Sequence, residues 1–313
     1  MPGRRDDGRE PPLAEGESLR TVIVALLANA GVSAAKFVAA ALTHSTAMLA
    51  EALHATADTG NQVLLLLADR RARRPADAAH PLGHGREAYF WALLAALGMF
   101  LTGGLLAVRQ GLLELMHPVR IASPVAAYVV LGVSFCLDGL SLMRATRQLK
   151  KEAATLKLAF REHFDRSSDP VGRAVFAEDA VAMVGNLVAL AGIVLDRLTG
   201  LAAPDAAAAL VIGLFLTVVA LDLTRRNRDF LVGRQASAAV RDGLRRLIAG
   251  QPGVVGVREL WVTFLGPRRL WVLARVAVDD RLDGRALKHL LRATEAAVAA
   301  QSASFVRVDL VPC

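Results

Sequence analysis

The stretch AEALHATADTGNQ places acids and a histidine inside a segment that otherwise has the composition of a buried helix. On a helix with about 100° per residue, Glu51, His54 and Asp58 fall within roughly 60° of one another. Asn61 and Gln62 extend the same stripe. A histidine and an aspartate four residues apart can both reach one ion, and imidazole nitrogen with carboxylate oxygen suits zinc and other first-row divalent metals. The stripe therefore indicates a ligand site or a proton path, with a polar seam between packed helices as the alternative.

A second apolar stretch, FAEDAVAMVGN, also carries acids. Asp179 and Asn186 share one helix face, whereas Glu178 points about 100° away from Asp179. A central acid in a membrane helix costs about 2.5–3.5 kcal/mol on insertion scales, so two acid-bearing helices are expected to converge on one cavity. Asp138 in FCLDGLSL is a further acid at depth, for which a packing hydrogen bond and a proton relay stay equally open. Lys36 is expected to snorkel toward the nearer membrane surface.

The segment PADAAHPLGHGRE differs, because its candidate ligands sit among prolines and glycines. Asp77, His80 and His84 follow the spacing D-x-x-H-x-x-x-H, which lets three ligands meet on one tight loop. Histidines in such turns often bond only the backbone, which is the alternative interpretation. The pattern predicts a second metal site beside the membrane.

The composition indicates a membrane part joined to a polar part. Of the 313 residues 54% are hydrophobic and 21% are charged, and the mean hydropathy is +0.40. That is too apolar for an ordinary soluble domain and too charged for a chain that is membrane throughout. A membrane-spanning helix needs about 20 mostly apolar residues. The predicted spans are Leu19–Leu42, Ala47–Ala68, Ala88–Leu113, Pro124–Met143, Val171–Leu195 and Pro204–Leu223.

Basic residues orient these six spans. The links after the second and fourth spans hold thirteen lysines and arginines, against two in the three opposite links. The positive-inside rule then places both termini in the cytoplasm, with residues 1–18 as a disordered cytosolic tail. The net charge of +8 is accordingly a topology signal, and nucleic-acid binding is not expected, because no basic-aromatic surface motif accompanies it. Cys136 and Cys313 predict neither a disulfide framework nor a cysteine zinc site.

The composition changes after Arg234. The stretch SAAVRDGLRRLIAGQPG has helical apolar spacing behind a serine cap, and VVGVRELWVTFL and LWVLARVAV have the character of strands. DGRALKHLLRATEAAVAAQ is helical again, and SFVRVDLV alternates as a last strand. The order α-β-β-α-β predicts a cytosolic α+β domain over 234–313, behind a six-helix transmembrane domain over 19–233.

Taken together, STAMLAEALHATADTGNQ, HPLGHGREAYFW, the six spans and the α+β tail resemble the cation diffusion facilitator family. Within that family, the two motifs look most like the subgroup of mitochondrial-type zinc exporters and their bacterial relatives. The resemblance covers nearly the whole chain, with a highly specific loop motif. It implies a ferredoxin-like dimerisation domain and a homodimer that exports divalent metal in exchange for protons, without ATP or a tightly bound cofactor.

The resemblance implies a ligand set for the transport site. His54 and Asp58 of the second helix and Asp179 of the fifth would bind the metal. The zinc members' usual fourth ligand is a histidine four residues before that last acid, and this position holds Val175. One ligand short of four, the set would be completed by Glu178, Glu51 or water.

The resemblance also assigns the auxiliary loop site to Asp77, His80 and His84. Many members bind zinc in the cytosolic tail through several histidines, whereas this tail has only His289. The strand positions that would supply ligands hold residues such as Arg258 and Arg275. A regulatory zinc site in the tail is therefore not expected.

These residues predict a proton-coupled efflux transporter for divalent metal, with zinc first and manganese, cobalt, iron, cadmium and nickel as alternatives. The Ala/Arg-rich composition suits a bacterial-type plasma membrane, and no enzyme activity is expected. An intramembrane metal-dependent hydrolase is a different-class alternative, but it needs a metal-bound water and a general base, and the sequence has no H-E-x-x-H element. The other alternative is a membrane metal sensor that binds without transport.

Overall fold

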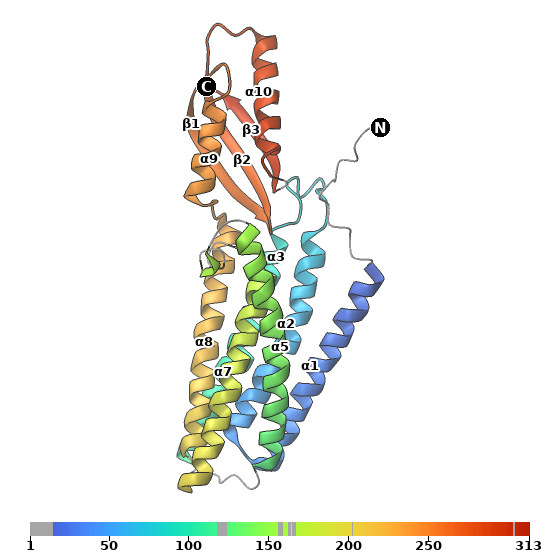
Figure 1. Cartoon of the computed structure of the whole chain (residues 1–313), viewed down its shortest axis with the longest axis vertical. Helices are drawn as coiled ribbons and strands as arrows, with labels where there is room; N and C mark the ends of the chain where they lie inside the picture. The colour runs from blue at the N-terminus through green and yellow to red at the C-terminus, as the bar shows by residue number, and fades with distance from the viewer. Residues whose placement is uncertain are drawn as a thin grey trace.

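The computed structural model describes residues 15–117, 124–155, 159–161, 164, 167–201, 203–302 and 304–313. Long helices run side by side up to Val232, and a small sheet with two helices stands at one end of them (Figure 1). Most of the predicted tail, residues 1–18, lies outside the described residues. Helix α1 begins at Glu15, so residues 15–18 are helical.

Helices occupy all six predicted spans. Four stretches within the described residues are long and apolar enough to cross a membrane, so the chain is a multi-pass membrane protein. They are Glu87–Met116, Val125–Lys151, Pro170–Thr199 and Ala203–Val232. The helices are α1 (Glu15–Thr43), α2 (Thr46–Ala72), α3 (Glu87–Gly98), η1 (Met99–Leu105), α4 (Leu106–Met116), α5 (Val125–Thr155), α7 (Pro170–Thr199) and α8 (Ala203–Val232). Helix α2 is not among these four stretches, because its polar stripe makes it less apolar. A topology with six membrane spans therefore stays a prediction.

Local capping explains where α2 and α7 begin. Ser45 caps α2 by accepting from the backbone N–H of Met48 at 3.0 Å. The buried carboxylate of Asp205 accepts from the Ser45 hydroxyl at 2.7 Å, so α8 fixes the turn before α2. Asp169 caps α7 in the same way, directly before Pro170 at the first helical position.

The third span contains a π-helical segment, η1, that the sequence pattern does not predict. Gly104 of η1 lies against Thr217 of α8, and Gly213 of α8 lies against Val108 of α4. In both places a side chain larger than hydrogen would meet atoms closer than 3.0 Å. Small residues of this kind let membrane helices approach closely, and they hold the third span against α8.

The C-terminal part has the predicted order α-β-β-α-β. Its elements are α9 (Ala238–Ala249), β1 (Val254–Gly266), β2 (Arg269–Val278), α10 (Gly284–Ala299) and β3 (Phe305–Pro312). The sheet order is β1-β2-β3, with β1 antiparallel and β3 parallel to β2. The parallel pair requires a crossover, which α10 supplies. Val262, Val272, Ala274 and Val276 are fully buried with Ile248 of α9 in a core of their own.

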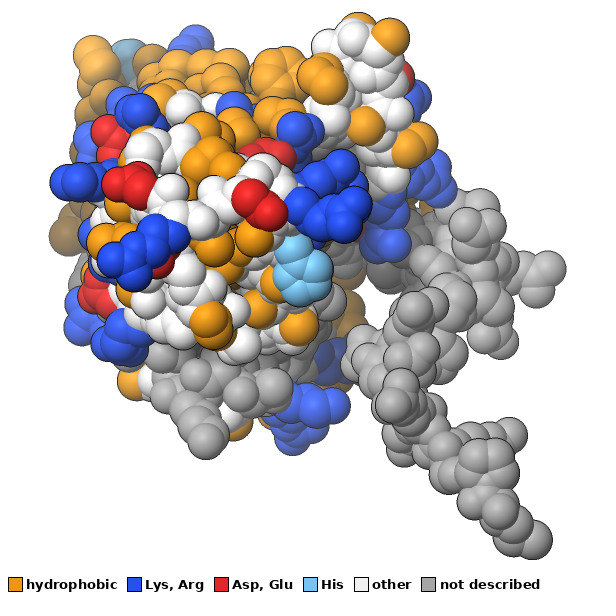
Figure 2. Space-filling model, turned by 90° about the horizontal axis from the view of Figure 1, so that it is seen from above, with side chains coloured by type: hydrophobic (Ala, Val, Ile, Leu, Met, Phe, Trp, Pro, Cys, Tyr) orange, Lys and Arg blue, Asp and Glu red, His pale blue; other side chains and the backbone are white. Residues whose placement is uncertain are grey.

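The loop between α2 and α3 touches the sheet. Gly85 lies directly on Gly266 at the β1–β2 turn. A Cβ at Gly85 would collide with the carbonyl oxygen of Leu265, which is backbone and has no flexible end to move aside. The loop after α2 therefore lies at the sheet end of the bundle, and so does Ser168, whose hydroxyl accepts from the backbone N–H of Arg268 at 3.0 Å. A view onto this end shows many Lys and Arg side chains on its surface (Figure 2).

Aromatic stacking ties the helix ends to β1. The Tyr89 ring of α3 stacks on Phe230 of α8 with centroids 4.8 Å apart, and Phe230 meets Phe264 of β1 edge to face at 5.2 Å. Arg173 of α7 is almost fully buried, with its guanidinium carbon 5.3 Å from the Phe230 ring centroid. The sheet part is thus anchored on α3, α7 and α8.

Gly85→Ala is expected to lower the thermal unfolding midpoint, because the added methyl group forces loop and sheet apart. Overpacking of this kind costs about 1–3 kcal/mol. Thermal unfolding of the detergent-purified protein, followed by intrinsic fluorescence, measures the effect. Gly243→Ala in α9 is the matched control, since a Cβ there meets nothing within 4 Å. Equal midpoints for the two variants would contradict the close approach.

Candidate metal sites

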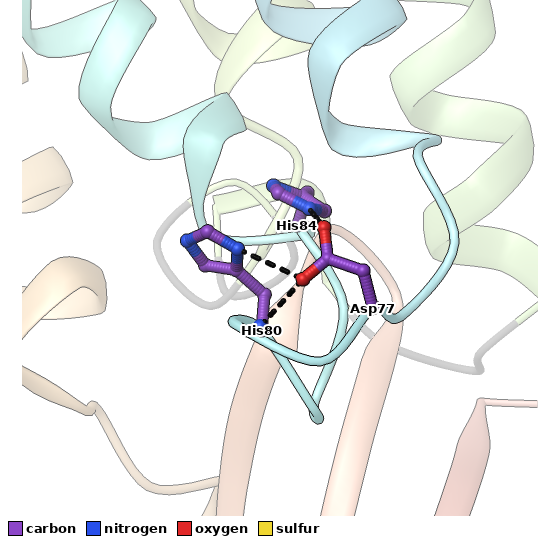
Figure 3. Close-up of side chains that lie close together, drawn as sticks. All are labelled: Asp77, His80 and His84. Atoms are coloured by element: carbon purple, nitrogen blue, oxygen red, sulfur yellow. Dashed lines mark hydrogen bonds and ion pairs between the residues drawn. The ribbon is translucent and has the colours of Figure 1, made fainter.

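Asp77, His80 and His84 converge on the loop between α2 and α3 (Figure 3). One ligand atom from each lies within 4.8 Å of the others, and no further cluster of three or more His, Cys, Asp or Glu side chains is this tight in the described part of the chain. Asp77 Oδ1 accepts from the backbone N–H of His80 at 2.7 Å and lies 3.2 Å from His80 Nδ1. Asp77 Oδ2 lies 2.9 Å from His84 Nε2. The turn holds three ligand groups of the types that suit a first-row divalent metal.

His84 is held between two carboxylates. Its Nε2 faces Asp77, and its Nδ1 lies 3.0 Å from Glu87 Oε1. The hydrogen bond to Asp77 raises the pKa of His84, and the same contact holds the pKa of Asp77 well below its usual range. A metal on this loop would displace the proton between Asp77 and His84, while Glu87 keeps the ring oriented from behind.

A cavity of about 100 Å³ lies between α1, α2, α5 and α7. Carboxylates from three helices face it, together with one lysine. The charged lining residues are Lys36, Asp58, Asp138, Glu178 and Asp179. The expected convergence of acid-bearing helices therefore occurs here, and it includes α5 as well as α2 and α7.

His54 lies beside this cavity and is fully buried. Its Nε2 is 3.4 Å from Asp58 Oδ2. Within the described residues neither ring nitrogen has a hydrogen-bond partner, an arrangement that costs free energy in a buried site. His54 does not belong to the lining of the cavity, and His54, Asp58 and Asp179 do not form a tight cluster in the part of the chain that the structure describes.

The other acids have partners on neighbouring helices. Asn61 of α2 donates to Glu178 of α7, and Ser141 of α5 donates to Asp179 at 2.6 Å. Asn186 of α7 donates to Asp138 of α5 at 2.8 Å, which is the packing hydrogen bond considered for that acid. Asn61 and Asn186 lie on the stripes predicted from the sequence. Ser141 was not predicted from the sequence, although it follows Asp138 by nearly one helical turn.

Lys36 does not snorkel as predicted. Its side chain is 2% exposed, and Nζ donates to Glu51 Oε2 at 2.8 Å. Glu51 itself is fully buried and, within the described residues, does not line the cavity. The prediction for Lys36 was wrong because the ammonium group pairs with a buried carboxylate on the next helix.

Val175 lines the acid-rich cavity one helical turn before Asp179. A second cavity of about 300 Å³ lies between α5 and α7, and both cavities are lined by Ser141 and Val175. The lining of this second cavity includes Arg144 of α5 and also Asp169, which directly precedes α7. Because Asp169 stands beside the sheet end of the bundle, the two cavities together approach that end.

Comparison with known proteins decides the family. The family model described as "Cation efflux transmembrane domain" matches residues 22–232, well over half of the chain. The chain belongs to the cation diffusion facilitator family. The match covers α2, α5 and α7, the helices whose acids line the cavity, and also the loop with Asp77, His80 and His84. The family and the relatives below are transporters, not enzymes.

Named relatives agree with this assignment. The facilitator is 32% identical over 263 residues to "Proton-coupled zinc antiporter SLC30A9, mitochondrial" of Xenopus laevis, covering 84% of this chain and 47% of that protein. It is 36% identical over 217 residues to "Metal tolerance protein C4" of Arabidopsis thaliana, covering 69% and 48%. "Metal cation efflux system protein CzcD" of Cupriavidus metallidurans is 25% identical over 270 residues, covering 86% and 79%. The chain thus spans about half the length of the first two relatives.

Among solved structures, a variant of the "MamM CTD" is similar to part of the facilitator. It has 21% identity, covers 24% of this chain and 88% of that chain, and gives a TM-score of 0.23.

Asp77→Asn is expected to lower the pKa of His84 toward that of an ordinary histidine. The neutral amide no longer favours the charged imidazolium, while the contact with Glu87 remains. Nuclear magnetic resonance titration of the histidine side chains, with His84→Ala to assign the signal, measures the shift without metal. Glu259→Gln removes a carboxylate from an exposed ion pair in the sheet and serves as the control. A His84 pKa that stays raised in Asp77→Asn would contradict the geometry.

Proposed function

We propose that this facilitator is a proton-coupled efflux transporter for divalent metal cations, with zinc as the first candidate. One observation carries the proposal: carboxylates of α2, α5 and α7 line a common cavity inside the membrane helices. Intramembrane acids are costly and therefore mark paths for cations or protons. The names of the relatives, which include a proton-coupled zinc antiporter and a metal cation efflux system, support the same activity.

In this proposal His54, Asp58 and Asp179 bind the transported metal. His54 offers a ring nitrogen with no other hydrogen-bond partner among the described residues, and Asp58 lies next to it on α2. Asp179 faces the same cavity as Asp58, from α7. Glu178, which faces that cavity too, is the best placed of the groups considered for completing the ligand set. Glu51 is the weaker candidate because Lys36 already holds it.

Proton exchange follows from the ligand chemistry. A metal binds neutral imidazole and ionised carboxylates, so protons leave these groups when the metal arrives. On the far side of the membrane protons return and compete the metal off. Rocking of helix groups around the site, which gives alternating access, is the expected motion. Ser45 and Asp205 fix one end of α2 to α8 in this arrangement.

The proposed topology has six membrane spans, including α1 and α2, with both termini and the sheet part in the cytoplasm. The basic links at the sheet end support this orientation. Asp77, His80 and His84 then form an auxiliary metal site on the cytoplasmic side. The sheet part acts as a ferredoxin-like dimerisation domain of a homodimer, and the membrane is a bacterial-type plasma membrane.

Asp58→Ala is expected to abolish metal flux, because the cavity loses a charged ligand. Reconstituted vesicles loaded with a metal-sensitive dye report uptake of zinc, manganese, cobalt, iron, cadmium and nickel. Asp222→Ala, which removes an exposed acid from α8, is the matched control. Unchanged zinc flux in a folded Asp58→Ala variant would contradict the proposal. Metal binding without flux in the parent protein would instead favour the sensor.

Val175→His is expected to raise the ratio of zinc to manganese affinity. The new imidazole faces the cavity with Asp179, and one histidine nitrogen added to His54 and two carboxylates gives an N₂O₂ set that suits tetrahedral zinc. Manganese prefers more oxygen ligands and should gain little. Titration of both metals against the parent, Val175→His and Val175→Leu separates the nitrogen from the added bulk. An unchanged or lower ratio in Val175→His would show that the position does not face the ion.

A further inference from the structure

Lys36 is a basic side chain in a cavity that is otherwise lined by acids. It is 2% exposed and lines the cavity together with Asp58 and Asp138. Its ammonium nitrogen is paired with Glu51 Oε2 at 2.8 Å. A lysine buried in a membrane helix is costly and marks a functional position unless the pair serves only to join helices.

The pair with Glu51 is incomplete. Glu51 Oε1 has no hydrogen-bond partner among the residues that the structure describes. It lies against Gly185 of α7, where any Cβ would collide with it. A buried ion pair is worth little to stability unless further hydrogen bonds satisfy its remaining atoms. Helix joining alone is therefore a poor explanation for this charge.

The surroundings of Lys36 offer it other partners. Asp58 and Asp138 line the same cavity as Lys36. Lys36 extends from α1, whereas the acids come from α2 and α5. A four-carbon side chain with three rotatable donors can move between such neighbours.

We propose that Lys36 is a tethered cation of the transport cavity, a role that rests on the proposed function. When a divalent cation occupies the cavity, Lys36 is held by Glu51. When the cation leaves, the ammonium group turns to Asp58 and Asp138 and offsets one unit of their negative charge. Lys36 thereby competes with the metal, weakens its binding and promotes its release.

This role predicts effects of opposite sign for the two members of the pair. Lys36→Gln removes the competing charge, so zinc should bind about tenfold or more tightly, the effect of one like charge at close range. Glu51→Gln frees the ammonium group to face the cavity acids, so zinc should bind more weakly. In the double variant Lys36→Gln/Glu51→Gln the competitor is absent, and zinc should again bind more tightly than in the parent.

The experiment titrates zinc against the full chain in detergent, by competition with a chelating dye at fixed pH. All variants carry His80→Ala and His84→Ala, so that the loop ligands do not contribute. Lys36→Gln leaves a buried carboxylate unpaired, and the double variant keeps the test decisive if that single variant fails to fold. Zinc flux in vesicles should fall in both variants that lack Lys36, because release slows.

Weaker zinc binding in all three variants is the result expected of a purely structural pair, and it would overturn the proposal. Binding unchanged in Lys36→Gln and in the double variant would overturn it as well. Asp58→Ala in the same background separates this outcome from failure of the proposed function. If zinc affinity depends on Asp58 but not on Lys36, only the proposed role of Lys36 is overturned. If zinc affinity does not depend on Asp58, the role of Lys36 and the proposed transport site are both overturned.

Discussion

The cost of burying charge in membrane helices governs the architecture of this protein. Lys36 joins α1 to α2, Asn61 joins α2 to α7, and Ser141 joins α5 to α7. In each of these contacts an ionisable group inside the bundle meets a polar partner on a neighbouring helix, which offsets part of that cost. These contacts lie around the cavity, on the helices α2, α5 and α7 that supply its acids. The polar pairs that would weaken an ordinary apolar bundle therefore define where the helices meet.

Close backbone contacts set the positions of the remaining parts. Glycine contacts hold the third span against α8, and Gly85 presses the α2–α3 loop onto the β1–β2 turn. The loop carrying Asp77 and His84 is consequently placed between the end of α2 and the sheet. A shift of the sheet part would move this loop directly. The same displacement reaches α8 through Phe230, which packs on Phe264 of β1.

The sequence is sufficient to predict the elements and the faces of the helices, but not their neighbours. Periodicity places Asp58 and Asp179 on buried stripes, and proline and glycine mark the loop that carries the candidate metal ligands. Periodicity does not show which helix lies opposite a given side chain. For that reason the pairing of Lys36 with Glu51 was missed. The π-helical segment was missed because it depends on packing against α8 rather than on local propensity.

The two candidate sites share one electrostatic arrangement. In each of them a basic group of the chain lies beside the acids: Lys36 lines the cavity with Asp58 and Asp138, and His84 Nε2 lies 2.9 Å from Asp77. In the proposed function, a divalent metal that enters either site competes with a positive charge that is covalently attached or bound as a proton. Such competition weakens metal binding, and it lowers the cost of leaving acids without a cation in a low dielectric when the metal departs. Exchange of one cation for another is the chemistry that the proposed function assigns to these two sites.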